Sequence, residues 1–261
     1  MNAPLPHDGN AWRVAALTMM RPQQLDALLA ANAQRALSWV RAAAEHGLAE
    51  AQVRLGRMML AGEGTEKNEA EALIWFSRAA ESGDAEAQNM LGRCFENGWG
   101  VEVDAARAAA LYASAAEQSH AWAQYNLGHM LLDGNGVARD RDAAFACYMR
   151  ASEQGHERAM NLLARCYEEG WGVGRDAVAA RGWYRQSAER GYFRGQYNYA
   201  SILESEGRIA CALYWFGQAL ACAPEPTRSA MARALRQNRH PQLYALPDRI
   251  DAAAGLTEGL I

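Results

Sequence analysis

The sequence lacks several features that would place it in a specialised class of protein. None of its apolar runs reaches the ~18 residues that a membrane-spanning helix needs. Its formal net charge is −4, whereas proteins that hold a phosphate backbone carry a basic surface, so nucleic-acid binding is disfavoured. Residues 1–10 have neither the basic nor the apolar stretch of a secretory signal. We therefore expect no membrane insertion and a location in the cytoplasm.

Cysteine and proline are also scarce. The five cysteines form no CxxC pair, and they fall at helical, mostly apolar positions, so we expect buried free thiols in a reducing compartment. They are Cys94, Cys147, Cys166, Cys211 and Cys222. The seven prolines cluster near the two ends of the chain. The long middle therefore offers few interruptions to helices.

What the sequence does contain is a repeat of 36 residues. Two columns of glycine keep this step, namely Gly62, Gly98, Gly134 and Gly170, and Gly64, Gly100, Gly136 and Gly172. A third column holds Gly47, Gly83, Gly155 and Gly191, with Ser119 in the missing place. A pair of bulky residues recurs in the same register, as in Trp75-Phe76 and Trp183-Tyr184. Several columns that hold one period over most of a chain indicate a repeat architecture.

Each unit divides into two amphipathic helices. In residues 120–155, apolar residues at helical spacing lead to Gly134, where glycine accepts the left-handed backbone of a helix end. Asp140 then stands at the N-cap of the second helix, and its column contains Asn68, Asp104 and Asp176. The small residues Gly56, Gly92, Gly128, Ala164 and Ala200 recur in mid-helix. We expect them to lie opposite the bulky residues of the partner helix, in the core between helices.

The segments AQYNLGHMLLDGNGVARD and AFACYMRASEQG, residues 123–140 and 144–155, resemble the Sel1-like repeat, a relative of the tetratricopeptide repeat. The resemblance covers roughly residues 48–222. It implies an all-α fold, a right-handed superhelical α-solenoid of about five helix pairs, whose concave face binds other proteins. It implies no enzymatic activity, cofactor or metal.

The two ends of the chain depart from the repeat. Residues 204–208 replace the glycine-containing loop, and the spacing from Trp183 to Trp215 is 32 residues instead of 36. We predict a non-repeat helical cap over residues 1–31, the solenoid over residues 32–223, and a helical cap with a tail over residues 224–261. Such caps are expected because an open solenoid end would expose core.

One face of the first helices carries residues that differ from unit to unit, and in the resemblance this face lines the groove. We predict that a partner protein or peptide binds there to Arg57, Asn89, Arg93, Trp122, Tyr125, His129, Arg158, Asn161, Arg165, Arg194 and Tyr197. Arginine, tyrosine and tryptophan are enriched at binding hot spots. Arg93 and Arg165 would pair with carboxylates of an acidic or C-terminal segment. The alternative is that this face is simply solvated, although lysine and glutamate would then be expected.

Signs of chemistry are weak. The six histidines form no HxxxH or HExxH spacing, so we read them as surface residues and predict no metal site. Tyr125, His129 and Asp133 on one helix could serve catalysis, with Asp133 orienting His129, but this is the least favoured hypothesis. The sequence favours a non-enzymatic adaptor or scaffold. An inhibitor that neutralises a toxin or enzyme by enclosing it, as an immunity protein does, needs the same surface and stays open, as does the oligomeric state.

Overall fold

The computed structural model describes residues 33–258, and every regular element in that range is an α-helix. The chain divides into two compact units, residues 1–139 and residues 140–261. None of the described helices is both long and apolar enough to cross a membrane. The cap predicted over residues 1–31 lies outside the described residues. The predicted boundaries at residues 31/32 and 223/224 stay predictions.

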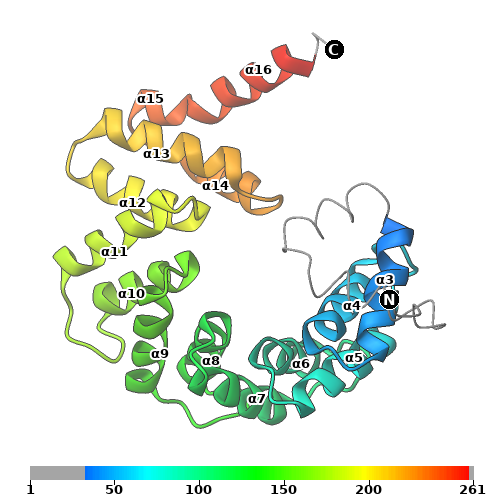
Figure 1. Ribbon diagram of the computed structural model, residues 1–261. Coiled ribbons are helices and arrows are strands. Elements are labelled where there is room, and N and C mark those ends of the chain that lie inside the picture. The colour runs from blue at the N-terminus through cyan, green and yellow to red at the C-terminus, as the bar shows by residue number, and fades with distance from the viewer. Residues whose placement is uncertain (1–32, 259–261) are drawn as a thin grey trace, which may run out of the picture. The chain divides into compact units, whose positions relative to one another are not determined.

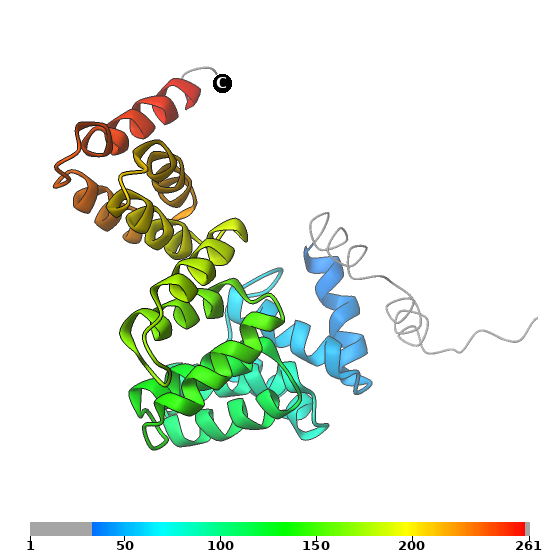
Figure 2. The ribbon, with the colours of Figure 1, turned by 90° about the vertical axis from the view of Figure 1, so that its left-hand side faces the viewer.

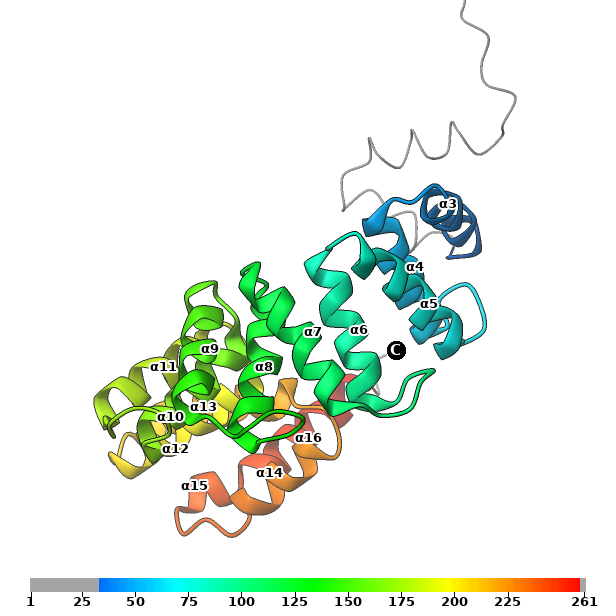
Figure 3. The same cartoon turned by 90° about the horizontal axis from the view of Figure 1, so that it is seen from below.

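Unit 1 is a row of helices in which each packs against the next along the chain (Figure 1). The helices are α3 (Ala33–Glu45), α4 (Ala49–Ala61), α5 (Glu69–Glu81), α6 (Ala85–Asn97), α7 (Ala105–Glu117) and α8 (Ala121–Asp133). Figure 3 shows α6, α7 and α8 following one another side by side. The even-numbered helices are the first helices of the repeats, and the odd-numbered ones are the second.

Unit 2 continues the pattern of helix pairs and then departs from it. Its helices are α9 (Arg141–Glu153), α10 (Glu157–Glu169), α11 (Ala177–Glu189), α12 (Phe193–Ser205), α13 (Ile209–Cys222), α14 (Thr227–Leu235), α15 (Pro241–Tyr244) and α16 (Leu246–Glu258). Both α14 and α16 pack against α13 (Figure 2). Leu235, Leu243 and Leu246 from this last part join a core that reaches back to Ala164.

The predicted helix boundaries are confirmed by the caps. The side chain of Asp140 accepts a hydrogen bond from the backbone N–H of Ala143, and Asn68, Asp104 and Asp176 do the same in their repeats. At the other end, Gly134 has φ +75° and its N–H donates to the carbonyl of Met130. Each capping side chain satisfies a backbone N–H at the start of a helix that has no intrahelical partner.

The predicted contact between small and bulky residues is also confirmed. A Cβ on Gly56 would lie 2.6 Å from the ring of Phe76, and one on Gly92 would lie 2.7 Å from the ring of Tyr112. The second member of each pair of bulky residues is buried, including Tyr184 and Phe216. Trp75 is buried as well, but Trp183 is only half-buried. The second position of each bulky pair therefore fills the core.

The second glycine of each loop fixes how one repeat contacts the previous one. A Cβ on Gly100 would lie 2.5 Å from the carbonyl oxygen of Glu69, the first residue of α5. The equivalent glycines Gly136 and Gly172 approach the first residues of α7 and α9 in the same way. Their φ angles of +69° and +68° also lie in the region that favours glycine. Each loop is therefore held against the start of the second helix in the preceding repeat.

The prediction of five buried thiols is only partly correct. All five cysteines are free, and Cys94, Cys147 and Cys166 are buried, but Cys211 and Cys222 are exposed. Burial raises the pKa of the Cys94 thiol to about 12 and that of Cys166 to about 11. Cys211 and Cys222 both lie on α13, and the equivalent positions on and directly after α11, Ala179 and Arg190, are not buried either. The cytoplasmic location stays a prediction.

Candidate functional site

The first helices of unit 1 are joined side by side through one carboxylate. Arg57 on α4 forms an ion pair with Glu86 on α6. Glu86 also lies 2.7 Å from Nε2 of His120, the residue that precedes α8. Burial alone would raise the pKa of Glu86, but the His120 hydrogen bond and the charge of Arg57 outweigh it and hold that pKa below its ordinary value. Glu86 therefore carries its charge and links three consecutive first helices.

Beside this link, α8 presents a row of aromatic rings. The rings of Trp122 and Tyr125 lie 5.9 Å apart, and those of Tyr125 and His129 lie 4.7 Å apart, both edge to face. Trp122 is 40% exposed, which is unusual for so large an apolar side chain. The structure thus brings these three predicted residues together. Asp133, the third member of the catalytic hypothesis, is exposed at the last position of α8.

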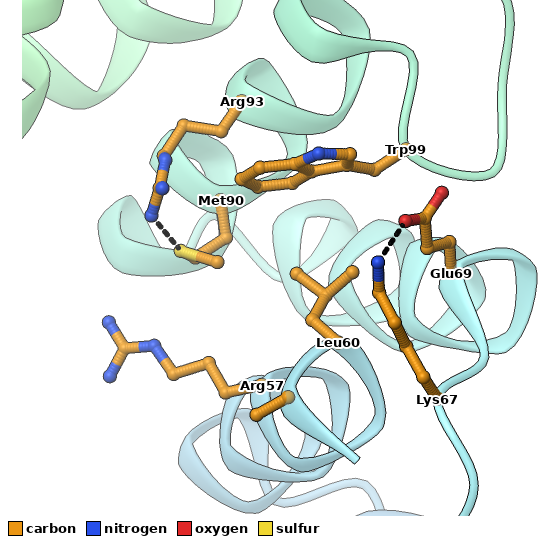
Figure 4. Close-up of a pocket in the computed structure, with 8 residues that line it drawn as sticks. Arg57, Leu60, Lys67, Glu69, Met90, Arg93 and Trp99 are labelled. Atoms are coloured by element: carbon orange, nitrogen blue, oxygen red, sulfur yellow. Dashed lines mark hydrogen bonds and ion pairs between the residues drawn. The ribbon is translucent and has the colours of Figure 1, made fainter. Parts of the chain in front are cut away.

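A pocket of about 400 Å³ lies between α4, the start of α5, and α6 with the loop that follows it. Its lining includes the predicted residues Arg57 and Arg93, together with Leu60, Met90 and Trp99. The guanidinium of Arg93 lies 4.9 Å from the centre of the Trp99 ring, and Arg93 also contacts the sulfur of Met90 at 3.6 Å. Figure 4 shows these side chains around the pocket.

Two predicted site residues are not at the surface. Asn89 and Asn161 are 3% and 4% exposed. Asn89 accepts a hydrogen bond from Asn126 on the next first helix, and Asn161 accepts one from Asn198. Their assignment to the binding surface was wrong, because the next repeat covers this side of the helix. A buried amide keeps its place there when it finds a polar partner.

In unit 2 the predicted residues lie on α10 and α12. The Arg165 guanidinium lies 4.9 Å from the centre of the Trp171 ring, in the same relation as Arg93 and Trp99. Arg158 and Arg194 lie 5.8 Å from the ring centres of Tyr192 and Phe193. Tyr197 packs edge to face on Phe216, with 5.0 Å between the ring centres, and burial raises the pKa of Tyr197. The arginines of this face are therefore seated on aromatic rings.

The family model of the Sel1 repeat matches residues 26–48, 49–84, 85–120, 123–156 and 157–192. The chain belongs to the Sel1 repeat family. The resemblance predicted from the sequence and the all-α fold of about five helix pairs are thus confirmed. No curated protein matches this chain.

Several solved Sel1 structures are similar to this one. A Sel1 repeat protein from Oxalobacter formigenes is 26% identical with a TM-score of 0.73, covering 92% of this chain and 96% of that one. The protective antigen c5321 of uropathogenic Escherichia coli, which displays an SLR fold, is 29% identical with a TM-score of 0.66; the match covers 86% of this chain and 50% of that one. This chain thus spans about half the length of that antigen. The immunity protein Pa5087 from Pseudomonas aeruginosa, at 20% identity, a TM-score of 0.54 and 78% of both chains, shares the fold.

Sequence reasoning missed several residues of these Sel1 repeats. His120 and His156 were read as surface residues, but each caps a first helix by accepting a hydrogen bond from a backbone N–H, and His156 is buried. Asp84 fills the same column one repeat earlier, which was a usable signal for a cap. Lys67, which also lines the pocket of unit 1, was missed because its place there depends on residues of α4 and α6. Among the described residues, no three His, Cys, Asp or Glu side chains gather as they would around a metal ion.

Proposed function

We propose that this protein binds a segment of another protein along its first helices and has no catalytic role of its own. The observation that carries this proposal is the group formed by Arg93, Trp122, Tyr125 and His129 on neighbouring helices of unit 1. We call this group, with Arg57 and Glu86, the first-helix surface. A solvated helix face would be expected to carry lysine and glutamate. Aromatic rings and arginine are instead the types that contribute most to binding.

The neighbours of these side chains support the proposal. The Glu86 link and the buried Asn89–Asn126 hydrogen bond tie α6 to α8, so the surface side chains stand on backbones that are already fixed. Arg93 and the α8 rings also rest on other side chains, which restricts their rotamers before a partner arrives. Less conformational entropy is then lost on binding.

A catalytic role for Tyr125, His129 and Asp133 has less support. His129 meets the Tyr125 ring edge to face, and Asp133 stands exposed on the last turn of the helix. A general acid or base generally sits in a site shielded from water, where its pKa is tuned. Sel1 repeats as a family also imply binding and not chemistry.

An inhibitory role is the second form of the same proposal. Pa5087 and a second solved neighbour, PA5088, are both immunity proteins from Pseudomonas aeruginosa. Because they are only 20% and 18% identical to this chain, these similarities support a shared fold and nothing more. Adaptor and inhibitor require the same kind of surface, so the identity and activity of the captured partner distinguish them.

The test is quantitative affinity capture from a lysate of the source cells with three forms of the full chain. The forms are wild type, Trp122→Ala with Arg93→Glu, and the control Tyr214→Ala. Tyr214 is also an exposed aromatic residue at 59%, but it lies on the second helix α13. We expect a stoichiometric partner with wild type and with the control, and its loss with the double variant. A partner retained by a folded double variant would contradict the proposal.

A further inference from the structure

We propose that the pocket beside Arg93 in unit 1 receives an aspartate or glutamate side chain of the bound segment, next to an apolar residue of the same segment. This inference rests on the proposed function and gives the partner a chemical character. The occupant is an acidic peptide segment. The pocket is part of the first-helix surface, because Arg57 and Arg93 belong to both.

The pocket has two ends of different character (Figure 4). At one end, Arg57 from α4 and Arg93 from α6 extend to the same side. At the other end, Lys67 and Glu69 close the pocket with an ion pair of 2.7 Å. Leu60, Met90 and the Trp99 ring form the wall between them. A ligand that fits must therefore place charge at the arginine end and apolar surface against the wall.

The balance of formal charges around the pocket decides which charge that ligand must carry. Arg57 is paired with Glu86, and Lys67 is paired with Glu69. The Lys67 hydrogen bond lowers the pKa of Glu69, so that carboxylate is charged and compensates its partner. Arg93 contacts the Trp99 ring and the Met90 sulfur, neither of which carries a formal charge. The pocket is therefore lined by three cations and one carboxylate. Glu86, outside the lining, compensates Arg57, so the excess positive charge sits on Arg93.

The placement of Arg93 suits a carboxylate in particular. Stacking on an indole holds the plane of a guanidinium and leaves its N–H edge to bond a ligand. Two parallel N–H groups on one edge match the two oxygens of a carboxylate. The arginine is only half-buried, so a ligand reaches it without displacing the core. The adjoining indole and Leu60 offer apolar surface to the neighbouring side chain of the segment.

Unit 2 provides a contrast. One of its pockets, of about 660 Å³, has Arg175 and Arg181 with Glu168 and Glu206 in its lining, which makes the formal charges equal. Arg181 is paired with Glu206 at 3.2 Å. Arg165, which is stacked on Trp171, does not line that pocket. A further pocket of unit 2, lined by Arg228, Arg233, Arg236, Glu225 and Asp251, does have an excess of positive charge, but no aromatic ring lines it. The combination of spare positive charge with an apolar wall distinguishes the site in unit 1.

The experiment is selection from a phage-displayed library of random dodecapeptides on the full chain, followed by fluorescence anisotropy with one selected peptide. Wild type is compared with Arg93→Glu, Arg93→Lys and the control Arg78→Glu. Arg78 is a matched control, since it also stacks on a tryptophan of unit 1, at 4.7 Å from the Trp75 ring, but on the second helix α5. Circular dichroism of each variant verifies the fold.

We expect peptides selected on wild type to be enriched in an acidic residue next to an apolar one. Arg93→Glu should raise the Kd by roughly tenfold or more, because it removes a charge-assisted hydrogen bond and puts a carboxylate in its place. Arg93→Lys should raise the Kd by less, and Arg78→Glu should leave it unchanged. Replacing the acidic residue of the peptide by its amide should weaken binding to wild type and have little effect on Arg93→Glu.

The failures are distinguishable. Selected peptides that lack the acidic enrichment, or that bind Arg93→Glu as tightly as wild type, overturn the acidic pocket. If peptides that do not depend on Arg93 nevertheless lose binding to Trp122→Ala, the proposed function stands and only the acidic pocket is overturned. Failure to select any peptide on wild type overturns this inference together with the proposed binding of an extended segment.

Discussion

Asn126 on α8 donates a side-chain hydrogen bond of 2.9 Å to the buried Oδ1 of Asn89 on α6. The same relation recurs 72 residues later between Asn198 and Asn161, at 2.8 Å. The pair forms a buried polar contact between consecutive first helices. Removing the Asn126 side chain leaves the buried Oδ1 of Asn89 without this hydrogen-bond donor.

Asn126→Ala should therefore destabilise unit 1 by about 1–3 kcal/mol, the cost of an unsatisfied buried polar group. Replacing both Asn89 and Asn126 by alanine should cost less than the sum of the single variants, because neither then strands the other. Urea unfolding followed by tryptophan fluorescence measures these differences. Strictly additive effects would mean that the hydrogen bond contributes nothing.

Ser119→Gly should stabilise the protein. Ser119 has φ +63°, whereas the equivalent positions are the glycines Gly47, Gly83, Gly155 and Gly191. A left-handed backbone costs a residue with a Cβ about 1–2 kcal/mol, and part of this gain is offset by the greater freedom of glycine in the unfolded chain. We expect a net increase of about 0.5–1 kcal/mol in the unfolding free energy. The reverse change, Gly83→Ser, should lower it.

Gly100→Ala should be among the most damaging single changes in unit 1. Its Cβ would meet the backbone of Glu69, and the φ of +69° adds strain. The two effects together should cost about 2–5 kcal/mol. Gly83→Ala is the matched control, because Gly83 has φ +86° but no atom within 4 Å of the added Cβ. Equal losses of stability in the two variants would show that the loop contact is unimportant.

Glu86 should make the stability of unit 1 sensitive to acid. Its folded-state pKa lies below its ordinary value of 4.5, so its contribution is present above that value and is lost as the pH falls through the folded-state pKa. Between about pH 5 and about pH 3, wild type should thus lose more stability than Glu86→Gln. The variant Glu102→Gln, at an exposed position, should follow wild type. Parallel curves for wild type and Glu86→Gln would refute the linkage.

The thiols should divide into two classes. Iodoacetamide should label Cys211 and Cys222 in the native protein, because both are exposed. Cys94, Cys147 and Cys166 should react only after unfolding, since burial shields them and raises their pKa. Peptide mass spectrometry of native and urea-treated samples measures this. Native labelling of Cys166 as fast as that of Cys211 would contradict the described core.

The sequence predicts the structural features that recur in every repeat. Asp140 and Gly134 each act through their own backbone and neighbouring turns, so one sequence is enough to recognise the cap and the helix end. The small residue opposite a bulky one, as in Gly92 and Tyr112, was also readable, since both columns recur.

Contacts that depend on how neighbouring helices pack could not be predicted from the sequence. Asn89 looked exposed because spacing along a helix identifies a face, but not which edge of that face the next helix covers. Cys211 was expected in the core because of its residue type and helical position, but it is exposed, and the equivalent Ala179 on α11 is not buried either. The role of Glu86 in linking the first helices likewise depends on Arg57 and His120, which come from two other segments of the chain.

The loop that rests on the start of each second helix has no counterpart between α12 and α13, where only residues 206–208 separate the helices. Among the described residues, no such loop lies against the start of α11. There the side chain of Asp176 accepts hydrogen bonds from two backbone N–H groups, those of Val178 and Ala179, and Val178 is 83% exposed. A longer array made by gene duplication or by design therefore has to gain its 36-residue units upstream of α12. A unit copied after α12 would follow a junction that has no loop to set its register.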